Sequence, residues 1–326
     1  MLNKRFLAVA GIGLVGALAF TASPASADPS GTPTYRDLAG VGSDTTEGVM
    51  NGLSQVILNS SNVKQIASYD AFGTATIKTK EVGCELNRPA GSGNGVTALV
   101  ASVDAANNCI DFARSSSNNA SSYAGKNLTY IPFAVDAVTY AVRGDGTLSR
   151  TLTKAQLTSI YNCGVAAYKP LLPQFGSGTR SFFLKQLGFT DSADFVQLAN
   201  HTCIAEKDST GTALQENNGT LVTATNQIVP YSIAQYLSQT AGVVNDVHGK
   251  VVLGALDGQS PTVLNTASTM VRDVYNVVPT AKLTDANVSS VFVGSTSKVC
   301  VNTTTIKRYG FAPHASCGDT TLRTPN

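Results

Sequence analysis

Short runs of β-branched residues alternate along the chain with longer runs whose apolar residues have helical spacing. In the stretch EGVMNGLSQVIL, for example, Val49, Leu53, Val56 and Ile57 fall on one face of a helix. Alternation of strand-like and helix-like segments is typical of α/β proteins. The chain has 326 residues, 43% of them apolar, which is enough for a sizeable core and suits two domains better than one. We therefore predict an α/β protein of two domains.

Four transitions in this pattern contain a small polar turn of Gly, Ser or Thr. The turns are Gly40–Thr46, Gly91–Gly95, Arg114–Ser117 and Gly176–Thr179. Three of them lead into helix-like segments, and the last of these segments ends at Gly188 as a helix C-terminus does. The remaining turn follows a strand-like run. Four such turns are more than helix capping alone requires.

Turns of this kind are suited to binding a small anion. The first turn of a helix has unpaired N–H groups and carries the positive end of the helix dipole. An anion placed there is therefore stabilised by hydrogen bonds and by the electrostatic field of the dipole. Glycines let the backbone approach closely, and hydroxyl groups add donors. One such turn alone would be an ordinary helix cap. Four turns with Arg114 and Arg180 close to them instead predict an oxyanion site.

Catalysis is a weaker interpretation of the same residues. Neither Ser92 nor Ser177 lies in the G-x-S-x-G sequence of a nucleophile elbow. His201, His248 and His314 lie beside cysteines or in a turn, where they are more typical of loops than of a catalytic base. The histidines and cysteines lack the short spacing of a metal site, and GSGTR lacks the lysine of a phosphate-binding P-loop. We expect no enzyme activity, no cofactor and no metal.

The N-terminal segment has the pattern of a secretory signal peptide. Lys4 and Arg5 precede an apolar run, and Ala-Ser-Ala at 25–27 is a typical cleavage site. We predict that residues 1–27 are removed and that the protein is extracellular or periplasmic, without a lipid anchor, because no cysteine follows the apolar run. Loss of Lys4 and Arg5 lowers the basic residues from 23 to 21, equal to the 21 acidic residues. This balance argues against nucleic acid as a partner.

Six cysteines in an exported chain predict disulfide bonds. They are Cys84, Cys109, Cys163, Cys203, Cys300 and Cys317. Fifteen pairings are possible, and the sequence does not choose among them. We favour pairing in sequential order, because each pair then lies within one apparent structural unit.

Two stretches have the character of crossings between the domains. They are YIPFAVDAVTYAVR, residues 130–143, and QIVPYSIAQYL, residues 227–237. We predict a discontinuous first domain of residues 28–134 and 236–326, with residues 135–235 inserted as the second domain. An insertion of about a hundred residues is a normal domain size.

The order of these motifs resembles that of the phosphate-binding proteins of Pst-type ABC transporters, which are type II periplasmic solute-binding proteins. A Gly-x-Gly-Ser turn near the mature N-terminus is followed by a Gly-Ser-x-x-Gly helix start, an Asp-Phe strand with a polar turn, Gly-Ser-Gly-Thr, and a Tyr-containing crossing. The resemblance covers most of the mature chain. It implies two α/β lobes joined by crossover strands, with an anion held between them by backbone N–H groups, hydroxyls, an arginine and a carboxylate.

The resemblance and the four turns together define one set of expected phosphate-binding residues. They are Ser43, Asp44, Thr45, Ser92, Gly93, Arg114, Ser115, Ser116, Ser177, Gly178, Thr179 and Arg180.

Two departures from the family pattern concern charge. The family's Asp-Phe strand usually ends in Ala-Ser-Asp, whose carboxylate accepts a proton from bound phosphate, whereas Ser116 takes the acid's place here. Asp44, the only acid in the four turns, is our candidate for the missing acceptor. The family's arginine before Gly-Ser-Gly-Thr is also absent, so Arg114 or Arg180 would supply the positive charge.

We therefore expect an exported, monomeric solute-binding protein that captures inorganic phosphate between two lobes, for uptake through an ABC permease. Another oxyanion, such as sulfate, molybdate or a phosphonate, remains open as the ligand. A secreted phosphatase or other hydrolase, and a non-transport interaction protein on the same fold, remain as alternatives.

Overall fold

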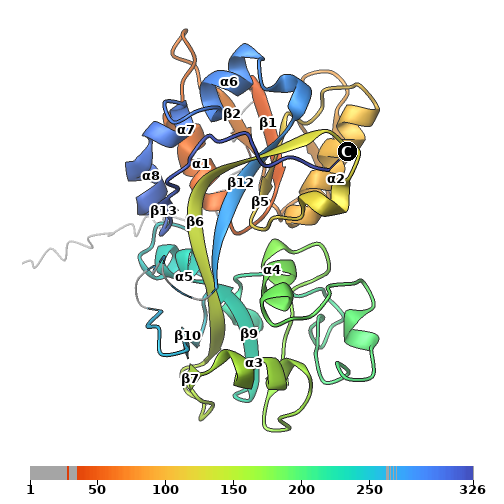
Figure 1. The fold of residues 1–326 in the computed structure, drawn as a ribbon, viewed down its shortest axis with the longest axis vertical. Helices are drawn as coiled ribbons and strands as arrows, with labels where there is room; N and C mark the ends of the chain where they lie inside the picture. The colour runs from red at the N-terminus through yellow and green to blue at the C-terminus, as the bar shows by residue number, and fades with distance from the viewer. Residues whose placement is uncertain are drawn as a thin grey trace, which may run out of the picture.

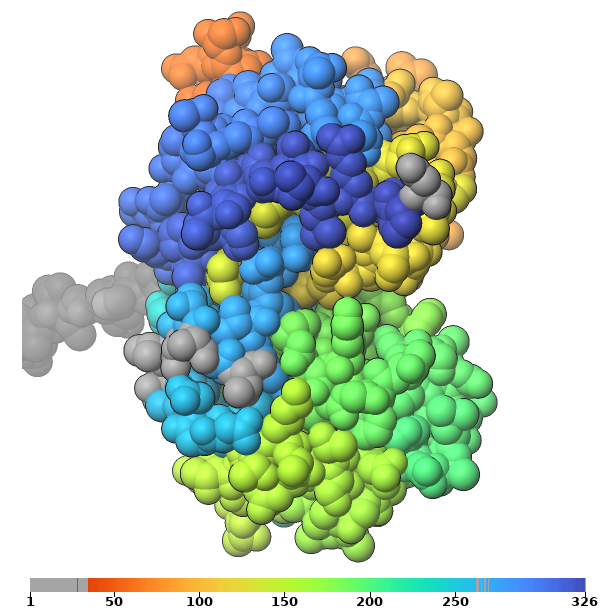
Figure 2. Space-filling model, viewed as in Figure 1, coloured from red at the N-terminus to blue at the C-terminus, as the bar shows by residue number. Residues whose placement is uncertain are grey.

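The computed structural model describes Asp28, residues 35–261, Leu264, Thr266, Ser268 and residues 270–325. The predicted signal peptide, residues 1–27, therefore lies outside the described residues, whereas Asp28, the predicted start of the mature chain, is described. Figure 1 shows two lobes, one above the other, with two long strands running between them. Figure 2 shows the lobes in contact, with yellow segments of the upper lobe against green segments of the lower lobe.

The upper lobe contains the early part of the chain together with its C-terminal part (Figure 1). Its elements are β1 (Leu38–Gly42), α1 (Glu47–Val56), β2 (Ile66–Ser68), β3 (Thr76–Lys78), β4 (Glu85–Asn87), α2 (Ser92–Asp104), β5 (Phe112–Ser115), α6 (Ala286–Phe292), α7 (Lys298–Val301), α8 (Thr303–Arg308) and β13 (Ala312–Pro313), with 3₁₀ turns at Ala120–Tyr123 and Thr280–Lys282.

The lower lobe contains the middle of the chain. Its elements are β7 (Thr151–Leu152), α3 (Lys154–Tyr161), β8 (Lys169–Pro170), α4 (Gly178–Gln186), β9 (Gln227–Ser232), α5 (Ile233–Thr240), β10 (Val251–Leu253) and β11 (Ala255–Leu256), with 3₁₀ turns at Phe195–Gln197 and Gly219–Leu221. The strands β6 (Leu128–Arg143) and β12 (Val271–Pro279) connect the two lobes.

One sheet runs through both lobes in the order β2-β1-β5-β12-β6-β9-β8. Strands β2, β1 and β5 are parallel, and β12 pairs antiparallel with both β5 and β6. Strand β6 pairs with β12 as far as Ala137 and with β9 from Val138 onward. The long strand therefore changes partner at the point where the chain passes from one lobe to the other.

Both faces of the sheet are covered in each lobe. In the upper lobe, one buried cluster forms around Leu53, Phe112 and Phe292, and another forms around Val96 and Tyr130. The lower lobe has its own two clusters. The predicted helical face of α1 is partly correct: Val49, Leu53 and Ile57 are buried, but Val56 is 49% exposed at the end of the helix.

The lower lobe extends beyond the predicted second boundary at residue 235. Strand β10 pairs with Ala141–Arg143 of β6, and β11 pairs with β7. Residues 251–256 thus lie with the lower lobe rather than with the upper one. The predicted crossing at residues 227–237 was wrong, because this stretch forms β9 and the start of α5 within the lower lobe. The chain returns along β12, which the sequence analysis did not identify as a crossing, because its run of valines reads equally well as an ordinary core strand.

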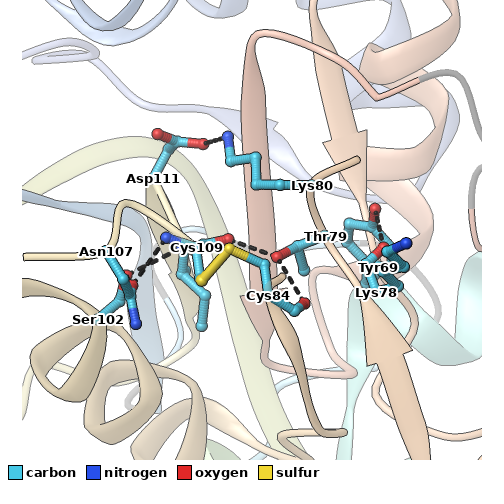
Figure 3. Close-up of a disulfide and its surroundings, with 10 residues drawn as sticks. Tyr69, Lys78, Thr79, Lys80, Cys84, Ser102, Asn107, Cys109 and Asp111 are labelled. Carbon is cyan, nitrogen blue, oxygen red and sulfur yellow. Dashed lines mark hydrogen bonds and ion pairs between the residues drawn. A yellow bond between two sulfur atoms is a disulfide. The ribbon is translucent and has the colours of Figure 1, made fainter. Parts of the chain in front are cut away.

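The three disulfides join the cysteines in sequential order, as favoured from the sequence. Cys84 bonds to Cys109, Cys163 to Cys203 and Cys300 to Cys317. Figure 3 shows the first of these, which ties the β3–β4 hairpin to the loop before β5. Nearby, the hydroxyl of Thr79 donates to the carbonyl of Cys109 at 2.6 Å. Among the described residues, no helix is both long and apolar enough to span a membrane.

Candidate functional site

The upper lobe brings three of the predicted turns to one edge. Strands β1 and β5 are parallel neighbours, so the turns after Gly42 and after Ser115 leave the sheet at the same end. The N–H of Ser43 donates to the carbonyl of Arg114 at 3.1 Å, which joins the two turns. The third turn starts α2 at Ser92, whose hydroxyl accepts from the N–H of Ser116 at 2.9 Å.

The lower lobe places the fourth turn against the other three. Ser177 caps α4, and Gly178 and Thr179 begin the helix. A Cβ on Gly178 would lie 2.2 Å from the hydroxyl oxygen of Ser92 and 2.4 Å from that of Ser116, so only glycine permits this approach. The N–H of Gly93 donates across the junction to a carbonyl of the lower lobe, that of Gly176, at 2.9 Å. The four turns predicted from separate parts of the sequence therefore meet.

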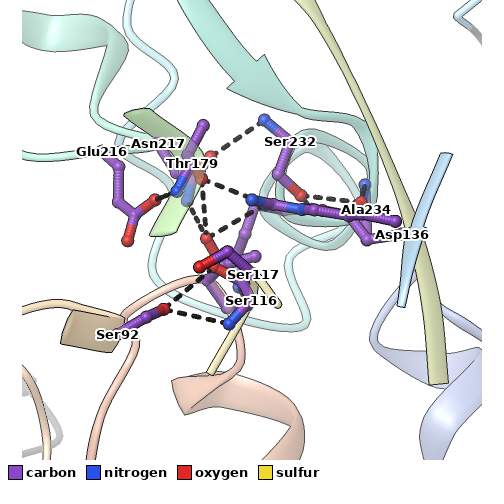
Figure 4. A network of polar contacts seen from close by, with 12 residues as sticks. Ser92, Ser116, Ser117, Asp136, Thr179, Glu216, Asn217, Ser232 and Ala234 are labelled. Carbon is purple, nitrogen blue, oxygen red and sulfur yellow. Dashed lines mark hydrogen bonds and ion pairs between the residues drawn. The ribbon is translucent and has the colours of Figure 1, made fainter. Parts of the chain in front are cut away.

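A network of hydroxyl groups lies where the lobes touch (Figure 4). The hydroxyls of Thr45 and Thr179, one from each lobe, are 3.2 Å apart. The side-chain amide of Asn217 donates to the Thr45 hydroxyl at 2.9 Å. Nη2 of Arg272 on β12 lies 3.0 Å from the Thr179 hydroxyl and 3.4 Å from that of Thr45. A guanidinium from the connecting strand thus contacts both lobes at once.

Arg272 is held by a buried carboxylate on the neighbouring connecting strand. Its Nε and Nη2 donate to Oδ2 of Asp136 on β6 at 3.0 and 2.8 Å, and the two residues are directly opposite in the ladder. Oδ1 of Asp136 accepts from the hydroxyl of Ser232 and from the N–H of Ala234 (Figure 4). Asp136 is completely buried and its oxygens are bonded, which fixes the guanidinium in place.

The structure does not place Arg114 or Arg180 where the sequence analysis expected an anion-binding charge. The guanidinium of Arg114 turns back under its own lobe and donates to the carbonyls of Gly40, Gly42 and Ser43. Arg180 is buried and forms ion pairs with Asp191 and Glu206 in the lower lobe. The partners of each guanidinium lie within its own lobe, so the expectation is corrected: Arg272 is the guanidinium that reaches the junction.

Two carboxyl groups face each other across the junction. Asp44 comes from the upper lobe, and Glu216 from a loop of the lower lobe accepts from the N–H of Thr179 at 2.9 Å (Figure 4). The two groups are within hydrogen-bonding reach of one another, and Oδ2 of Asp44 and Oε1 of Glu216 are buried without another partner. Burial, and then the negative charge of Glu216, raise the pKa of Asp44 well above its ordinary value. A raised pKa favours the protonated form of Asp44, which is the form that can share a hydrogen bond with Glu216.

Several other polar atoms, in these turns and on Arg272 of β12, are buried with no hydrogen-bond partner. Among the described residues they include the hydroxyl oxygens of Ser43 and Ser117 and Nη1 of Arg272. An unpaired polar group in a protein interior costs about 1 to 3 kcal/mol. Their concentration at the lobe junction indicates a place for a polar ligand.

The remaining expected residues have local roles. The Ser177 hydroxyl accepts from the N–H of Arg180, as a helix cap does, and that of Ser115 donates to the carbonyl of Ser117. Each histidine has a partner other than a site hydroxyl. Nδ1 of His201 lies 2.9 Å from the carbonyl of Tyr161, His248 pairs with Asp246, and His314 pairs with Asp273.

Four residues of this site were missed by the sequence analysis: Asp136, Glu216, Asn217 and Arg272. Asp136 and Arg272 had a usable signal, because each is a charged residue inside an apolar, strand-like run. Glu216 and Asn217 lie in an irregular loop and had none.

Comparison with solved structures identifies the architecture. A Clostridium perfringens protein assigned as a phosphate ABC transporter substrate-binding protein, with phosphate bound, aligns over 85% of this chain and 99% of its own, at 17% identity and a TM-score of 0.59. A phosphate-binding protein of Stenotrophomonas maltophilia aligns over 86% and 91%, at 14% identity and a TM-score of 0.55. An ABC-type phosphate transport receptor of Vibrio cholerae aligns over 84% and 99%, at 18% identity and a TM-score of 0.52.

The chain has the two-lobed type II periplasmic binding protein fold. The fold class expected from the sequence is therefore confirmed. At these identities the likeness concerns the fold alone. No model of a protein family matches the sequence, and no curated protein matches it.

Proposed function

We propose that the protein is an exported binding protein that captures an oxyanion, inorganic phosphate in the first place, between its two lobes. The observation that carries the proposal is the group of buried, unpaired donors at the junction: the hydroxyls of Ser43 and Ser117 and Nη1 of Arg272. A tetrahedral anion has four oxygens and can accept from several donors of this kind at once.

Helix geometry supports an anion at this place. Helices α1, α2 and α4 all begin at the turns that meet at the junction. Their first N–H groups and the positive ends of their dipoles favour negative charge there. Arg272 adds a full positive charge, and its bond to Asp136 keeps the guanidinium oriented without moving it out of reach of the Thr45 and Thr179 hydroxyls.

The carboxyl groups at the junction favour phosphate over sulfate as the ligand. At neutral pH phosphate retains a hydrogen that it can donate, and sulfate does not, so a buried acceptor favours phosphate. The Glu216 carboxylate, whose pKa is lowered, and the Asp44 carboxyl group beside it, once it loses its proton, are the groups that could accept this hydrogen. The proton that these two groups share would be rearranged when a protonated oxyanion binds.

Ligand entry requires the lobes to separate. The Thr45–Thr179 and Gly93–Gly176 contacts close the junction, and β6 and β12 are the strands about which the lobes would move. The closed form would be what a permease recognises. Three disulfides and a signal-like sequence at residues 1–27 support export.

The test is a calorimetric titration of the purified mature protein with phosphate, sulfate and molybdate. We expect heat with phosphate and a weaker response to sulfate. Heat with molybdate or sulfate alone would reassign the ligand, and no heat with any of the three would reject the binding proposal. Turnover of a chromogenic phosphate ester would point to the hydrolase alternative.

A further inference from the structure

A pocket of about 200 Å³ opens at the junction on the side of the two carboxyl groups. We call it the junction pocket. The upper lobe contributes Asp44, Glu47 and Phe72 to its wall, and the lower lobe contributes Glu216, Asn217 and Gln239. Because both lobes form it, the pocket exists in this shape only when they are closed. A ligand in this pocket therefore contacts both lobes in their closed arrangement.

The junction pocket adjoins the hydroxyl groups of the proposed anion site. Asp44 in its wall immediately precedes Thr45 in the chain. Glu216 in its wall accepts from the N–H of Thr179 at 2.9 Å through one carboxylate oxygen. Glu216 is buried, with 5% of its surface exposed. Its other oxygen, Oε1, has no partner except the facing Asp44. The junction pocket is therefore directly adjacent to the proposed anion site.

The charge of the junction pocket is opposite to that of the anion site. It has three carboxyl groups, and none of the described residues that line it is Lys or Arg. Two guanidinium groups lie behind the acids, but Arg114 donates to backbone carbonyls and Arg272 to Asp136. Oε2 of Glu47 accepts from the N–H of Ala71. The two guanidinium groups act electrostatically on Glu47 and Glu216 but are held by other partners, so the described pocket wall itself supplies no cation, and inorganic phosphate would add none.

We propose that the junction pocket binds the ammonium group of a short aminoalkyl phosphonate or phosphate ester whose anionic group occupies the adjoining hydroxyl and guanidinium donors. This inference rests on the proposed oxyanion function and narrows its ligand class. An ammonium group has three donors, which suit Oε1 of Glu216, the carboxyl group of Glu47 and Oδ2 of Asp44, whose proton the ammonium group would displace into solvent. The ring of Phe72 in the same wall offers an aromatic face to the cation.

The experiment compares two ligands that differ only in charge at one end. 2-Aminoethylphosphonate and n-propylphosphonate have the same number of heavy atoms, and only the first has an ammonium group. Both, together with inorganic phosphate, are titrated into the mature protein by calorimetry at pH 7.5. We expect 2-aminoethylphosphonate to bind at least about tenfold more tightly than n-propylphosphonate, a difference of about 1.4 kcal/mol.

Two variants test whether the preference for the aminated ligand arises in the junction pocket. Glu47→Gln keeps the shape of the side chain and removes one charge, so the preference for the aminated ligand should fall severalfold. Glu81→Gln makes the same change in the exposed turn between β3 and β4 and should leave the preference as it is. Both variants are compared by thermal unfolding to show that they are folded.

The outcomes separate this inference from the proposed function. Equal affinity for the two phosphonates, with phosphate still bound, would overturn the inference and leave the proposed function standing. No heat with any of the three ligands would overturn both. Binding of 2-aminoethylphosphonate without binding of inorganic phosphate would support the inference. Heat with calcium chloride alone that Glu47→Gln abolishes would overturn it, because the pocket would then be a site for a metal ion.

Discussion

Arg272 and Asp136 form a buried ion pair directly across two neighbouring strands, β12 and β6, with Nη2 and Oδ2 2.8 Å apart. These are the two strands that connect the lobes. The pair thus holds the Arg272 guanidinium between the lobes, on the strands about which we propose that the lobes move.

Removing the guanidinium should abolish most of the oxyanion affinity. A hydrogen bond to a charged group contributes about 1.5 to 3 kcal/mol, so phosphate should bind about ten- to a hundredfold more weakly. Arg272→Gln alone would leave the Asp136 charge buried and unpaired, at a cost of about 3 to 5 kcal/mol in stability. The better variant is Asp136→Asn with Arg272→Gln, which removes both charges. Calorimetry gives the affinity and urea unfolding the stability.

Arg150→Gln is the matched control for that experiment, because Arg150 is an exposed arginine of the lower lobe. Its phosphate affinity should equal that of the unmodified protein. Unchanged affinity in the double variant as well would show that Arg272 does not contact the ligand.

The Asp44 side chain should control the choice between phosphate and sulfate. Asp44→Asn replaces a carboxyl group, which can exchange the proton it shares with Glu216 when a protonated ligand binds, by an amide that cannot, so the preference for phosphate should fall by about tenfold. Glu216→Gln tests whether the facing carboxyl group shares this role. Affinities for both anions are measured by calorimetry on each variant. If Asp44→Asn keeps the original preference, the proposed role of Asp44 is wrong, and Glu216→Gln shows whether the neighbouring acid has it instead.

The sequence predicted the turns of this site better than its charges, for a physical reason. A turn such as Gly176–Thr179 is encoded locally, because glycine and a capping hydroxyl determine the backbone of the next few residues. The partner of an arginine is not encoded locally. Arg180 is adjacent to the predicted turn but pairs with Asp191 and Glu206, whereas Arg272 reaches the junction from a strand, 93 residues after Thr179. Such pairings depend on the tertiary fold.

The closeness of the two lobes at Gly178 gives a test of closure. In Gly178→Ala the new methyl group would meet the Ser92 and Ser116 hydroxyls at 2.2 and 2.4 Å, so the lobes could not close fully. We expect a larger radius of gyration by small-angle X-ray scattering and a loss of ligand affinity, with little change in the melting temperature. Ser181→Ala in the same helix serves as the control. A variant with the original radius and affinity would contradict the assignment of this contact to the closed junction.

The disulfide between Cys163 and Cys203 should be the strongest single contribution of the three to stability. It closes the longest segment, with a sequence separation of 40, against 25 and 17 for the other two. Loop-closure entropy gives about 4 kcal/mol for a loop of this length. Replacing both cysteines by alanine should therefore lower the free energy of unfolding more than the same change at Cys84 and Cys109. Urea unfolding of the two variants measures the difference, and the opposite order would contradict the entropic argument.

Stability should fall as the pH rises through the neutral range, because of Glu47. Burial first, and then the nearby Asp70 carboxylate, raise the pKa of Glu47 from 4.5 to about 7. Between these values the folded protein binds more protons than the unfolded chain, so the free energy of unfolding decreases from about pH 4.5 to about pH 7 and levels off above it. The loss is at most about 3 kcal/mol. Glu47→Gln should show a smaller decrease between pH 5 and pH 8 in urea unfolding, whereas the exposed Glu81→Gln should behave as the unmodified protein does. The same pH dependence in all three proteins would mean that Glu47 is ionised in the folded state throughout.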